Sequence, residues 1–356
     1  MMATATAAPP LKRLSSLEQF YLSAFWFSTN LMWGAILAVL VQSQVIVLVP
    51  DALKGTAVGL VIGLGSLAGI LVPPFMGAWS DRVRSRLGRR RPFMLVGTAL
   101  TLAALAGMAY FPFLPAAPLW GFSVAFWLYI GAYLLANFAN NFATAPYSAL
   151  LPDVVPVEQR GSASGWYGLM TLLGNGVGIV LVGSLVNHDA PLDQFRGQIY
   201  TVYTLIGIIL VIGTLISVLG TREPVVTAPP KPFRWPEFWR SLLQPFKSAD
   251  FFWVFFTRLL VTMGIFSIQN FLQLYMADVV KEFTIFGKAV ATTAEGAVTF
   301  MLLLLLLFSL FSSIAGGPLS DKYGRKLLVY ISGGVMALVA IALIVTHQYA
   351  AALVIG

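Results

Sequence analysis

The amino-acid sequence predicts an all-α membrane protein, on the evidence of its composition and of the spacing of its apolar runs. Hydrophobic residues make up 58% of the 356 positions and charged residues only 10%, shares far from those of soluble domains. An α-helix needs about 20 residues to cross about 30 Å of hydrocarbon. Apolar runs of that length lie at residues 19–49, 55–79, 92–114, 119–149, 162–187, 198–220, 251–277, 297–318 and 326–346. We therefore expect about nine complete transmembrane helices and the start of a tenth near Tyr349.

Positively charged residues are unevenly divided between alternate loops, which sets the expected orientation. The loops on one side hold most of the 22 Lys and Arg, whereas the other side holds Lys54, Arg196, Lys281 and Lys288. Because cytosolic loops carry an excess of Lys and Arg, we expect a cytosolic N-terminus in a plasma membrane of the bacterial inner-membrane kind. This placement also accounts for the net charge of +8. We expect membrane lipid around the chain and no nucleic-acid partner.

Several chemistries are disfavoured by what the sequence lacks. It contains no Cys, which excludes a disulfide framework and a thiolate metal site. No nucleophile stands beside a base, and no phosphate-binding loop follows a strand pattern. We therefore expect no enzyme activity, no catalytic residues, no metal and no cofactor.

One long polar segment divides the chain. Residues 221–250 are rich in proline and separate a six-helix half at 19–220 from an incomplete second half at 251–356, which holds helices seven to nine and the start of a tenth. Residues 1–18 lack the apolar core of a secretory signal, so we expect a cytosolic tail there. The aromatic residues around Trp235 allow two structures for the cytosolic linker at 221–250, a helix lying along the membrane surface or a disordered stretch.

Two loops share a sequence pattern. GAWSDRVRSRLGRRRP at residues 77–92 lies between the second and third spans, and GPLSDKYGRK at residues 317–326 lies between the eighth and ninth. Their aspartates, Asp81 and Asp321, occupy the same loop of each half, which is typical of an internally duplicated transporter. A third charged loop, residues 151–165, follows the fourth span.

These loops resemble those of the major facilitator superfamily. The second copy matches the family pattern G-x-x-x-D-[RK]-x-G-[RK]-[RK] at every fixed position, and the first carries four extra residues between Asp81 and Gly88. The resemblance implies a bundle of two six-helix halves that moves a solute by alternating access. Because the apolar run from Tyr349 to Gly356 ends without a polar tail, we expect a C-terminally truncated chain, and we expect a monomer.

We interpret the charged loops as a gate. Helix N-termini attract carboxylates, so we expect Asp81 to latch onto a helix of the opposite half, while the arginines exchange partners at the anionic membrane surface. The alternative is that these residues only set the topology. The expected gating residues are Gly77, Asp81, Arg82, Gly88, Arg89, Arg90, Asp153, Glu158, Arg160, Gly317, Asp321, Lys322, Gly324 and Arg325.

Polar residues recur at helical spacing on spans one, four and seven, three of those that the resemblance assigns to the central cavity. The fourth span carries the densest polar face. Amides, hydroxyls and aromatic rings suit a polyhydroxyl solute, whereas the alternative is hydrogen bonding between helices. The expected cavity residues are Asn30, Trp33, Tyr133, Asn137, Asn140, Asn141, Thr144, Arg258, Gln269 and Gln273.

The arginine triplet before Pro92 resembles the sucrose-transporter and glycoside-pentoside-hexuronide cation symporter branch. This implies a sugar or glycoside, with H⁺ or Na⁺ as coupling ion. The middles of the first six spans contain no Asp or Glu, so coupling is expected to use an edge carboxylate such as Glu18, Asp278 or Glu295, or later helices, or to be absent. Two rivals stay open: a drug or metabolite efflux transporter of the same fold, and a non-transporting membrane receptor or scaffold.

Glycines repeat at four-residue spacing on the second and fifth spans. Small residues let helix backbones approach closely in membranes, so we expect tight helix packing at these positions. The glycines are Gly55, Gly59, Gly63, Gly161, Gly165, Gly174 and Gly178.

Overall fold

The computed structural model consists of two compact units that are almost entirely helical. It describes residues 12–115, 117–187, 189–223, 233–285, 287–323, 325–346 and 348–355, with the side chains at 161, 241, 269, 270, 309–323, 325–329 and 355 outside the description. The first unit comprises Met1–Trp33, Leu60–Gly178 and Ile199–Pro230. The second comprises Gly34–Gly59, Ile179–Gln198 and Lys231–Gly356.

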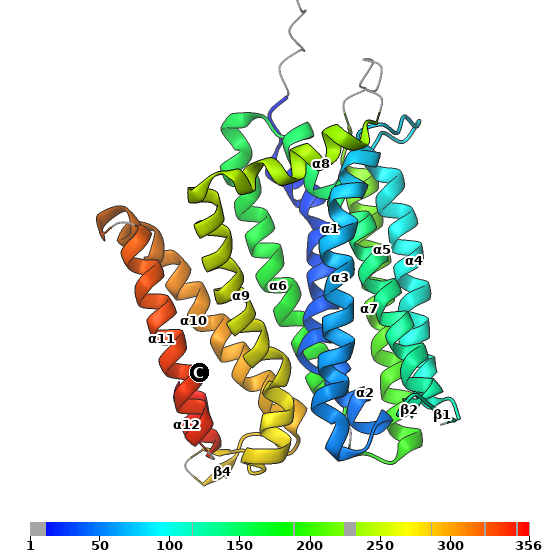
Figure 1. Ribbon diagram of the computed structural model, residues 1–356, viewed down its shortest axis with the longest axis vertical. Coiled ribbons are helices and arrows are strands. Elements are labelled where there is room, and N and C mark those ends of the chain that lie inside the picture. The colour runs from blue at the N-terminus through cyan, green and yellow to red at the C-terminus, as the bar shows by residue number, and fades with distance from the viewer. Residues whose placement is uncertain are drawn as a thin grey trace, which may run out of the picture. The chain divides into compact units, whose positions relative to one another are not determined.

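The first span begins at a capping box. The backbone N–H of Ser15 donates to Oε2 of Glu18 at 2.7 Å, and the N–H of Glu18 donates to Oγ of Ser15 at 3.2 Å. These two bonds satisfy donors that a helix start leaves free. The span then runs through α1 (Ser16–Ala35), the π-helical turn η1 (Ile36–Leu40) and α2 (Val41–Leu48) (Figure 1).

The next five long helices contribute wholly or partly to the first unit. They are α3 (Lys54–Ser80), α4 (Arg91–Tyr110), α5 (Val124–Val154), α6 (Arg160–Leu185) and α7 (Leu192–Gly220), with short 3₁₀ turns at Asp51–Leu53, Phe111–Phe113 and Val157–Gln159. Helices α4 and α5 run side by side (Figure 1) and meet where a Cβ on Gly97 would lie 2.6 Å from Cβ of Ala143. Buried Leu22, Phe25 and Tyr147 form part of the core beside them.

Helix α7 packs against α1 along a seam of small residues. Oγ of Ser217 accepts a hydrogen bond from the N–H of Phe25 at 2.8 Å and donates to O of Tyr21 at 2.7 Å. One turn to either side, a Cβ on Gly213 would lie 2.5 Å from Oγ of Ser28, and one on Gly220 would lie 2.7 Å from Tyr21. Close backbone approach at small residues is a common way for membrane helices to associate.

The second unit includes the later part of the linker and the chain that follows it. Its elements are α8 (Trp235–Leu243), a 3₁₀ turn (Gln244–Lys247), α9 (Ala249–Tyr275), the π-helical turn η6 (Met276–Val280), α10 (Ala294–Tyr323), α11 (Arg325–Val345) and α12 (Tyr349–Ile355). Strands β3 (Thr284–Ile285) and β4 (Lys288–Ala289) form an antiparallel pair. The hydroxyl of Tyr349 donates to O of Ala297 at 2.7 Å, which fixes α12 on α10.

The expected all-α class is confirmed, with local differences. Among the described residues, six helices are long and apolar enough to cross a membrane. The fourth span begins later than expected, because β1 (Pro118–Leu119) and β2 (Phe122–Ser123) form a hairpin before it. Ser123 then caps α5 by accepting from the N–H of Phe126. Of the two structures considered for the aromatic linker, a helix forms at α8.

The expected glycines differ in how closely they meet a neighbouring helix. A Cβ on Gly174 of α6 would lie 2.5 Å from O of Phe27 on α1, as expected for close packing. At Gly165 of the same helix, and at Gly55, Gly59 and Gly63 of α3, the expectation is wrong, since no described atom comes within 4 Å of an added Cβ. Spacing alone therefore does not identify which glycine face meets a neighbour.

Candidate functional site

The polar stripe of α5 lies along one face, and three of its side chains are bonded to the preceding turn. Nδ2 of Asn137 donates to O of Tyr133 at 3.1 Å, and Nδ2 of Asn141 donates to O of Asn137 at 2.8 Å. Oγ1 of Thr144 donates to O of Asn140 at 2.9 Å. Each amide keeps its carbonyl oxygen as an acceptor. All five expected residues of α5 therefore come together in the first unit.

The two ends of this stripe differ in burial. Tyr133 is 2% exposed and Asn137 is 9% exposed. Gly65 of α3 packs directly onto the Tyr133 ring, where an added Cβ would clash, and that Cβ would also lie 2.9 Å from Nδ2 of Asn137. Trp33 of α1 meets Tyr133 edge to face at 6.1 Å between ring centroids. This end packs helices together, whereas Asn140, Asn141 and Thr144 are half-buried.

Three aromatic rings stack across α1, α5 and α6. The ring centroids are 5.9 Å apart for Trp26 and Tyr147, 6.0 Å for Trp26 and Tyr167, and 5.5 Å for Tyr147 and Tyr167. Nε1 of Trp26 donates to Oγ1 of Thr171 at 2.8 Å, and the hydroxyl of Tyr147 donates to O of Leu22 at 2.6 Å. We call Trp26, Tyr147, Tyr167 and Thr171 the aromatic patch.

The aromatic patch was missed from the sequence. Tyr167 and Thr171 stand one helical turn apart on α6, a signal that was available, but the fifth span was interpreted as a glycine packing helix. Tyr147 is fully buried, whereas Trp26, Tyr167 and Thr171 are half-buried. Asn30 lies one turn beyond Trp26 on α1, is also half-buried, and donates through Nδ2 to O of Trp26 at 2.7 Å.

The three residues expected on α9 have different surroundings. Arg258 is exposed, and the side chain of Gln269 lies outside the described residues. Gln273 belongs to the second unit and is fully buried. Its Nε2 donates to Oγ of Ser43 at 2.9 Å and to Oε1 of Glu295 at 3.2 Å.

The charged loops of the first unit converge on one arginine. Arg90 has only 4% of its side chain exposed. Its Nη2 lies 2.7 Å from Oδ1 of Asp81, its Nε lies 3.2 Å from Oδ2 of Asp153, and its Nη1 donates to Oγ of Ser80. Arg89 adds a second ion pair to Asp153, at 2.6 Å. The planar guanidinium can serve several partners at once.

Glu223 also belongs to this cluster, although the sequence did not indicate it. Its carboxylate accepts hydrogen bonds from three consecutive backbone N–H groups, those of Arg89 at 2.8 Å, Arg90 at 3.1 Å and Arg91 at 3.0 Å. These groups form the start of α4, where free donors and the helix dipole favour a carboxylate. No sequence motif predicts this contact, because the partners of Glu223 are backbone N–H groups.

Of the other expected gating residues, Gly88 packs against the Glu223 carboxylate, which would lie 2.6 Å from an added Cβ. Arg82, in the turn after α3, donates to O of Ala78 near the end of that helix, and Glu158 is exposed. Arg160 is exposed and donates to O of Pro152 at 3.3 Å. No described atom lies within 4 Å of a Cβ built on Gly77. The second motif copy lies largely outside the description: the backbone at Gly317, Asp321, Lys322 and Arg325 is helical, their side chains are not described, and neither is Gly324.

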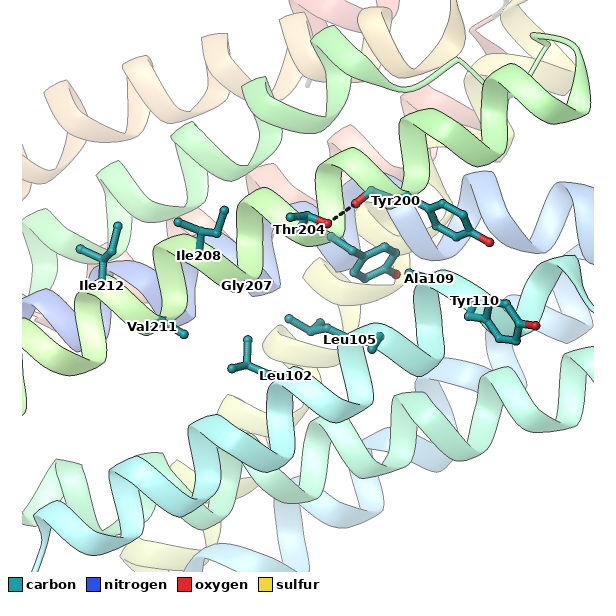
Figure 2. Close-up of a pocket in the computed structure, with 12 residues that line it drawn as sticks. Leu102, Leu105, Ala109, Tyr110, Tyr200, Thr204, Gly207, Ile208, Val211 and Ile212 are labelled. Atoms are coloured by element: carbon teal, nitrogen blue, oxygen red, sulfur yellow. Dashed lines mark hydrogen bonds between the residues drawn. The ribbon is translucent and has the colours of Figure 1, made fainter.

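A cavity of about 650 Å³ lies between α4 and α7 of the first unit, away from the polar stripe. Figure 2 shows Leu102, Leu105, Ile208 and Ile212 around it, and the Thr204 hydroxyl is bonded to O of Tyr200 in its own helix. Ile208 and Ile212 are each 50% exposed. Such an apolar, open groove fits an acyl chain of the lipid better than a polar solute.

Comparisons with known proteins agree with this architecture. The family model described as the Major Facilitator Superfamily matches residues 19–356. The General alpha-glucoside permease of Schizosaccharomyces pombe (strain 972 / ATCC 24843) is 33% identical over 168 residues, 46% of this chain and 30% of that relative. Proton-associated sugar transporter A of Homo sapiens is 27% identical over 208 residues, 56% of this chain and 26% of that relative. The matched segments thus span less than a third of either relative.

A solved structure shares the fold. The crystal structure of a D-xylose-proton symporter matches 95% of this chain and 77% of that chain, with a TM-score of 0.59 and 13% sequence identity. At this identity the likeness shows the fold alone.

Proposed function

The chain belongs to the major facilitator superfamily, and from this premise we propose that it moves a small polar solute, a sugar or glycoside, across a membrane by alternating access. The observation that carries the choice of solute is the aromatic patch together with the half-buried amides of α5. Aromatic faces stack on sugar rings, and amides and hydroxyls pair with sugar hydroxyls. The names of the sugar-transporting relatives support the same class of solute.

We propose an integral membrane protein with nine complete spans and the start of a tenth, and with the N-terminus in the cytosol. In addition to the six long apolar helices, α5 has 31 residues, α10 has 30 and α11 has 21, each at or above the length of about 20 residues that a bilayer requires. In this proposal residues 19–220 and 251–356 belong to two halves joined by the cytosolic linker at 221–250. The plasma membrane is the proposed location.

The Arg90 cluster is proposed as a cytosolic gate. Arg90 is buried while Asp81 has 55% of its side chain exposed, so that ion pair can open at lower cost than the one with Asp153. Release of Asp81 from Arg90 would free its carboxylate for a helix N-terminus in the other half. In this proposed gate, Asp81 exchanges the Arg90 guanidinium for the positive N-terminus of a helix as the two halves move.

Transport by the reconstituted full chain tests the function. Proteoliposomes would be loaded with buffer, and the uptake of radiolabelled sucrose, maltose and xylose measured for the wild type, Trp26→Ala and Asn140→Ala. We expect saturable uptake of at least one sugar. Trp26→Ala removes the indole ring and should lower the affinity for the sugar by up to about tenfold. Ring stacking contributes about 0.5–1.5 kcal/mol, and about 1.4 kcal/mol corresponds to a factor of ten in affinity. Trp120→Ala is the matched control, since Trp120 is 84% exposed in a hairpin turn.

The same vesicles separate the rival functions. Uptake of sugars that is unchanged in Trp26→Ala would remove the aromatic patch from the site. Flux of a cationic dye but of no sugar would indicate an efflux transporter of the same fold. Absence of any solute flux from folded protein would favour a membrane receptor or scaffold.

A further inference from the structure

A glutamate, a glutamine and a serine from three helices form a buried polar cluster in the second unit. Glu295 lies in the first turn of α10, Gln273 near the end of α9 and Ser43 on α2. All three side chains are 0% exposed. Ionisable residues within membrane spans are costly to bury and are functional candidates for that reason.

The hydrogen bonds of this cluster converge on one carboxylate oxygen. Nε2 of Gln273 and Oγ of Ser43 each donate to Oε1 of Glu295 at 3.2 Å, and Nε2 of Gln273 also donates to Oγ of Ser43 at 2.9 Å. Oε1 of Gln273 is buried and has no hydrogen-bond donor among the described residues. A buried acceptor of this kind is unusual in folded proteins and calls for a donor.

We propose that Glu295 is a proton-binding site and that Gln273 is the group that responds to its protonation. A hydronium ion in the solvent transfers its proton to the carboxylate: one O–H bond of the hydronium breaks, the Glu295 O–H bond forms, and a water molecule is released. If the Gln273 amide rotates by 180°, its Oε1 can accept a hydrogen bond from the new O–H of Glu295. Protonation of Glu295 then supplies the donor that Oε1 of Gln273 lacks. This inference rests on the proposed transport function, in which Glu295 is then the coupling group.

Two irregular turns lie beside the cluster. The π-helical turn η1 (Ile36–Leu40) ends three residues before Ser43, and η6 (Met276–Val280) begins three residues after Gln273. Single π-helical turns are rare and are frequent at functional sites. Both therefore mark places where α1–α2 and α9 can change shape next to the carboxylate.

The charged and titratable groups on the surrounding elements are few and known. Helices α2 and α12, the turn η1 and residues 179–185 of α6 carry no Asp, Glu, Lys, Arg or His. Near the cluster, α9 and η6 carry Tyr275 and Asp278, the β3–β4 region carries Lys281, Glu282 and Lys288, and α12 carries Tyr349. Farther away, the other end of α9 carries Asp250 and Arg258. The far ends of α10 and α11 carry Asp321 and Lys322, and Arg325 and Lys326, respectively.

The four nearby charged groups differ from Glu295 in exposure. Asp278, Lys281, Glu282 and Lys288 are all exposed, and exposed charges are strongly screened by water. Glu295, on α10, is instead buried against Ser43 of α2 and Gln273 of α9. Burial of a charged carboxylate there costs more than burial of the neutral acid, so protonation should favour the arrangement in which these three helices are packed together.

Spin-label distances measure that arrangement without any solute. The chain has no Cys, so Val47→Cys on α2 with Val279→Cys on η6, both exposed in the second unit, can be labelled selectively. Over a pH series that begins below the ordinary glutamate value of about 4.3 and extends to about pH 9, we expect one short distance at low pH and an additional longer one at high pH. In Glu295→Gln the short distance should persist throughout.

Two further variants make the test specific. Ser43→Ala removes a donor that stabilises the carboxylate, so the midpoint of the distance change should move to higher pH. Glu282→Gln removes an exposed acid of the same region and should titrate like the wild type. A distance change that survives in Glu295→Gln, or a wild type whose distances do not depend on pH, would overturn the proposal.

The ion and the coupling are tested separately. Replacement of choline chloride by NaCl at constant pH should leave the distances unchanged, whereas a Na⁺ effect that Glu295→Gln abolishes would assign the site to Na⁺ and not to H⁺. In proteoliposomes that take up sucrose, Glu295→Gln should retain sucrose exchange but lose accumulation driven by a pH gradient. If no sugar is transported at all, the proposed function fails while the distance titration still decides the proton site.

Discussion

Gly88 and Glu223 are in direct contact, and position 88 has room only for glycine. Gly88 has φ of +102°, and a Cβ added to it would lie 2.6 Å from Cδ of Glu223. The carboxylate that occupies this space accepts the N–H groups of the next three residues. The turn before α4 is thus shaped around a carboxylate that arrives from the end of α7, more than 130 residues later in the chain.

Gly88→Ala should destabilise the protein by about 1–3 kcal/mol, because the new methyl group displaces a carboxylate from three partly buried N–H donors. The measurement is the melting temperature of the purified protein in detergent. Gly121→Ala is the control, since Gly121 also has positive φ, +80°, but has nothing within 4 Å of its Cβ position. That variant reports the backbone strain alone. Equal losses in the two variants would mean that the contact with Glu223 contributes nothing.

Arg90→Lys should destabilise the protein although the charge is kept. The guanidinium of Arg90 bonds Ser80, Asp81 and Asp153 from three different nitrogens, and one ammonium group cannot reach all three. We expect a loss of about 1–3 kcal/mol from the groups left without partners, measured as a lower melting temperature. Arg160→Lys, at an exposed arginine with one hydrogen bond, should change stability by no more than about 0.5 kcal/mol.

Neutralising the two carboxylates that pair with Arg90, those of Asp81 and Asp153, should change thermal stability by different amounts. Asp153 has 21% of its side chain exposed and pairs with both Arg89 and Arg90, whereas Asp81 has 55% exposed and pairs with Arg90. Asp153→Asn should therefore lower the melting temperature more than Asp81→Asn, because an exposed ion pair contributes little to stability. Asp81→Asn should instead alter transport rate if the proposed gate is correct. A larger thermal loss for Asp81→Asn would reverse the assignment of structural and gating roles.

The helical class and the polar face of α5 could be predicted from the sequence, whereas contacts between distant segments could not. Tyr133, Asn137 and Asn141 share one face of α5, as their four-residue spacing predicted, and the all-α class followed from apolar runs. The spacing could not tell that Gly65 covers Tyr133 and Asn137, because burial depends on which helix lies opposite. Glu223 was missed for the same reason, since its partners are backbone N–H groups of the loop before α4.

The hydropathy pattern predicts where Glu295 lies along the chain, but not that its side chain is buried. The sequence places this residue at the start of an apolar run, where a solvated carboxylate is the ordinary expectation. Packing of Ser43 and Gln273 against it instead leaves it 0% exposed. A single apolar run carries no information about polar side chains that reach it from other helices.

Two glycines of α6 should respond to the same substitution with opposite signs. A Cβ on Gly174 would lie 2.5 Å from O of Phe27 and 3.0 Å from Cβ of Asn30, so Gly174→Ala must push α6 away from α1. Overpacking of this kind costs about 1–3 kcal/mol. Gly168 has nothing within 4 Å of its Cβ position, and alanine in a helix interior is favoured over glycine by about 0.5–1 kcal/mol.

Thermal unfolding of the two variants in detergent measures this difference in sign. Gly174→Ala should lower the melting temperature and Gly168→Ala should raise it slightly. The pair shares one helix and one chemical change, so differences in expression or detergent do not account for opposite shifts. A destabilised Gly168→Ala would show that α6 is covered at that position in the folded protein, and a neutral Gly174→Ala would show that α1 and α6 do not approach closely at the Phe27 carbonyl.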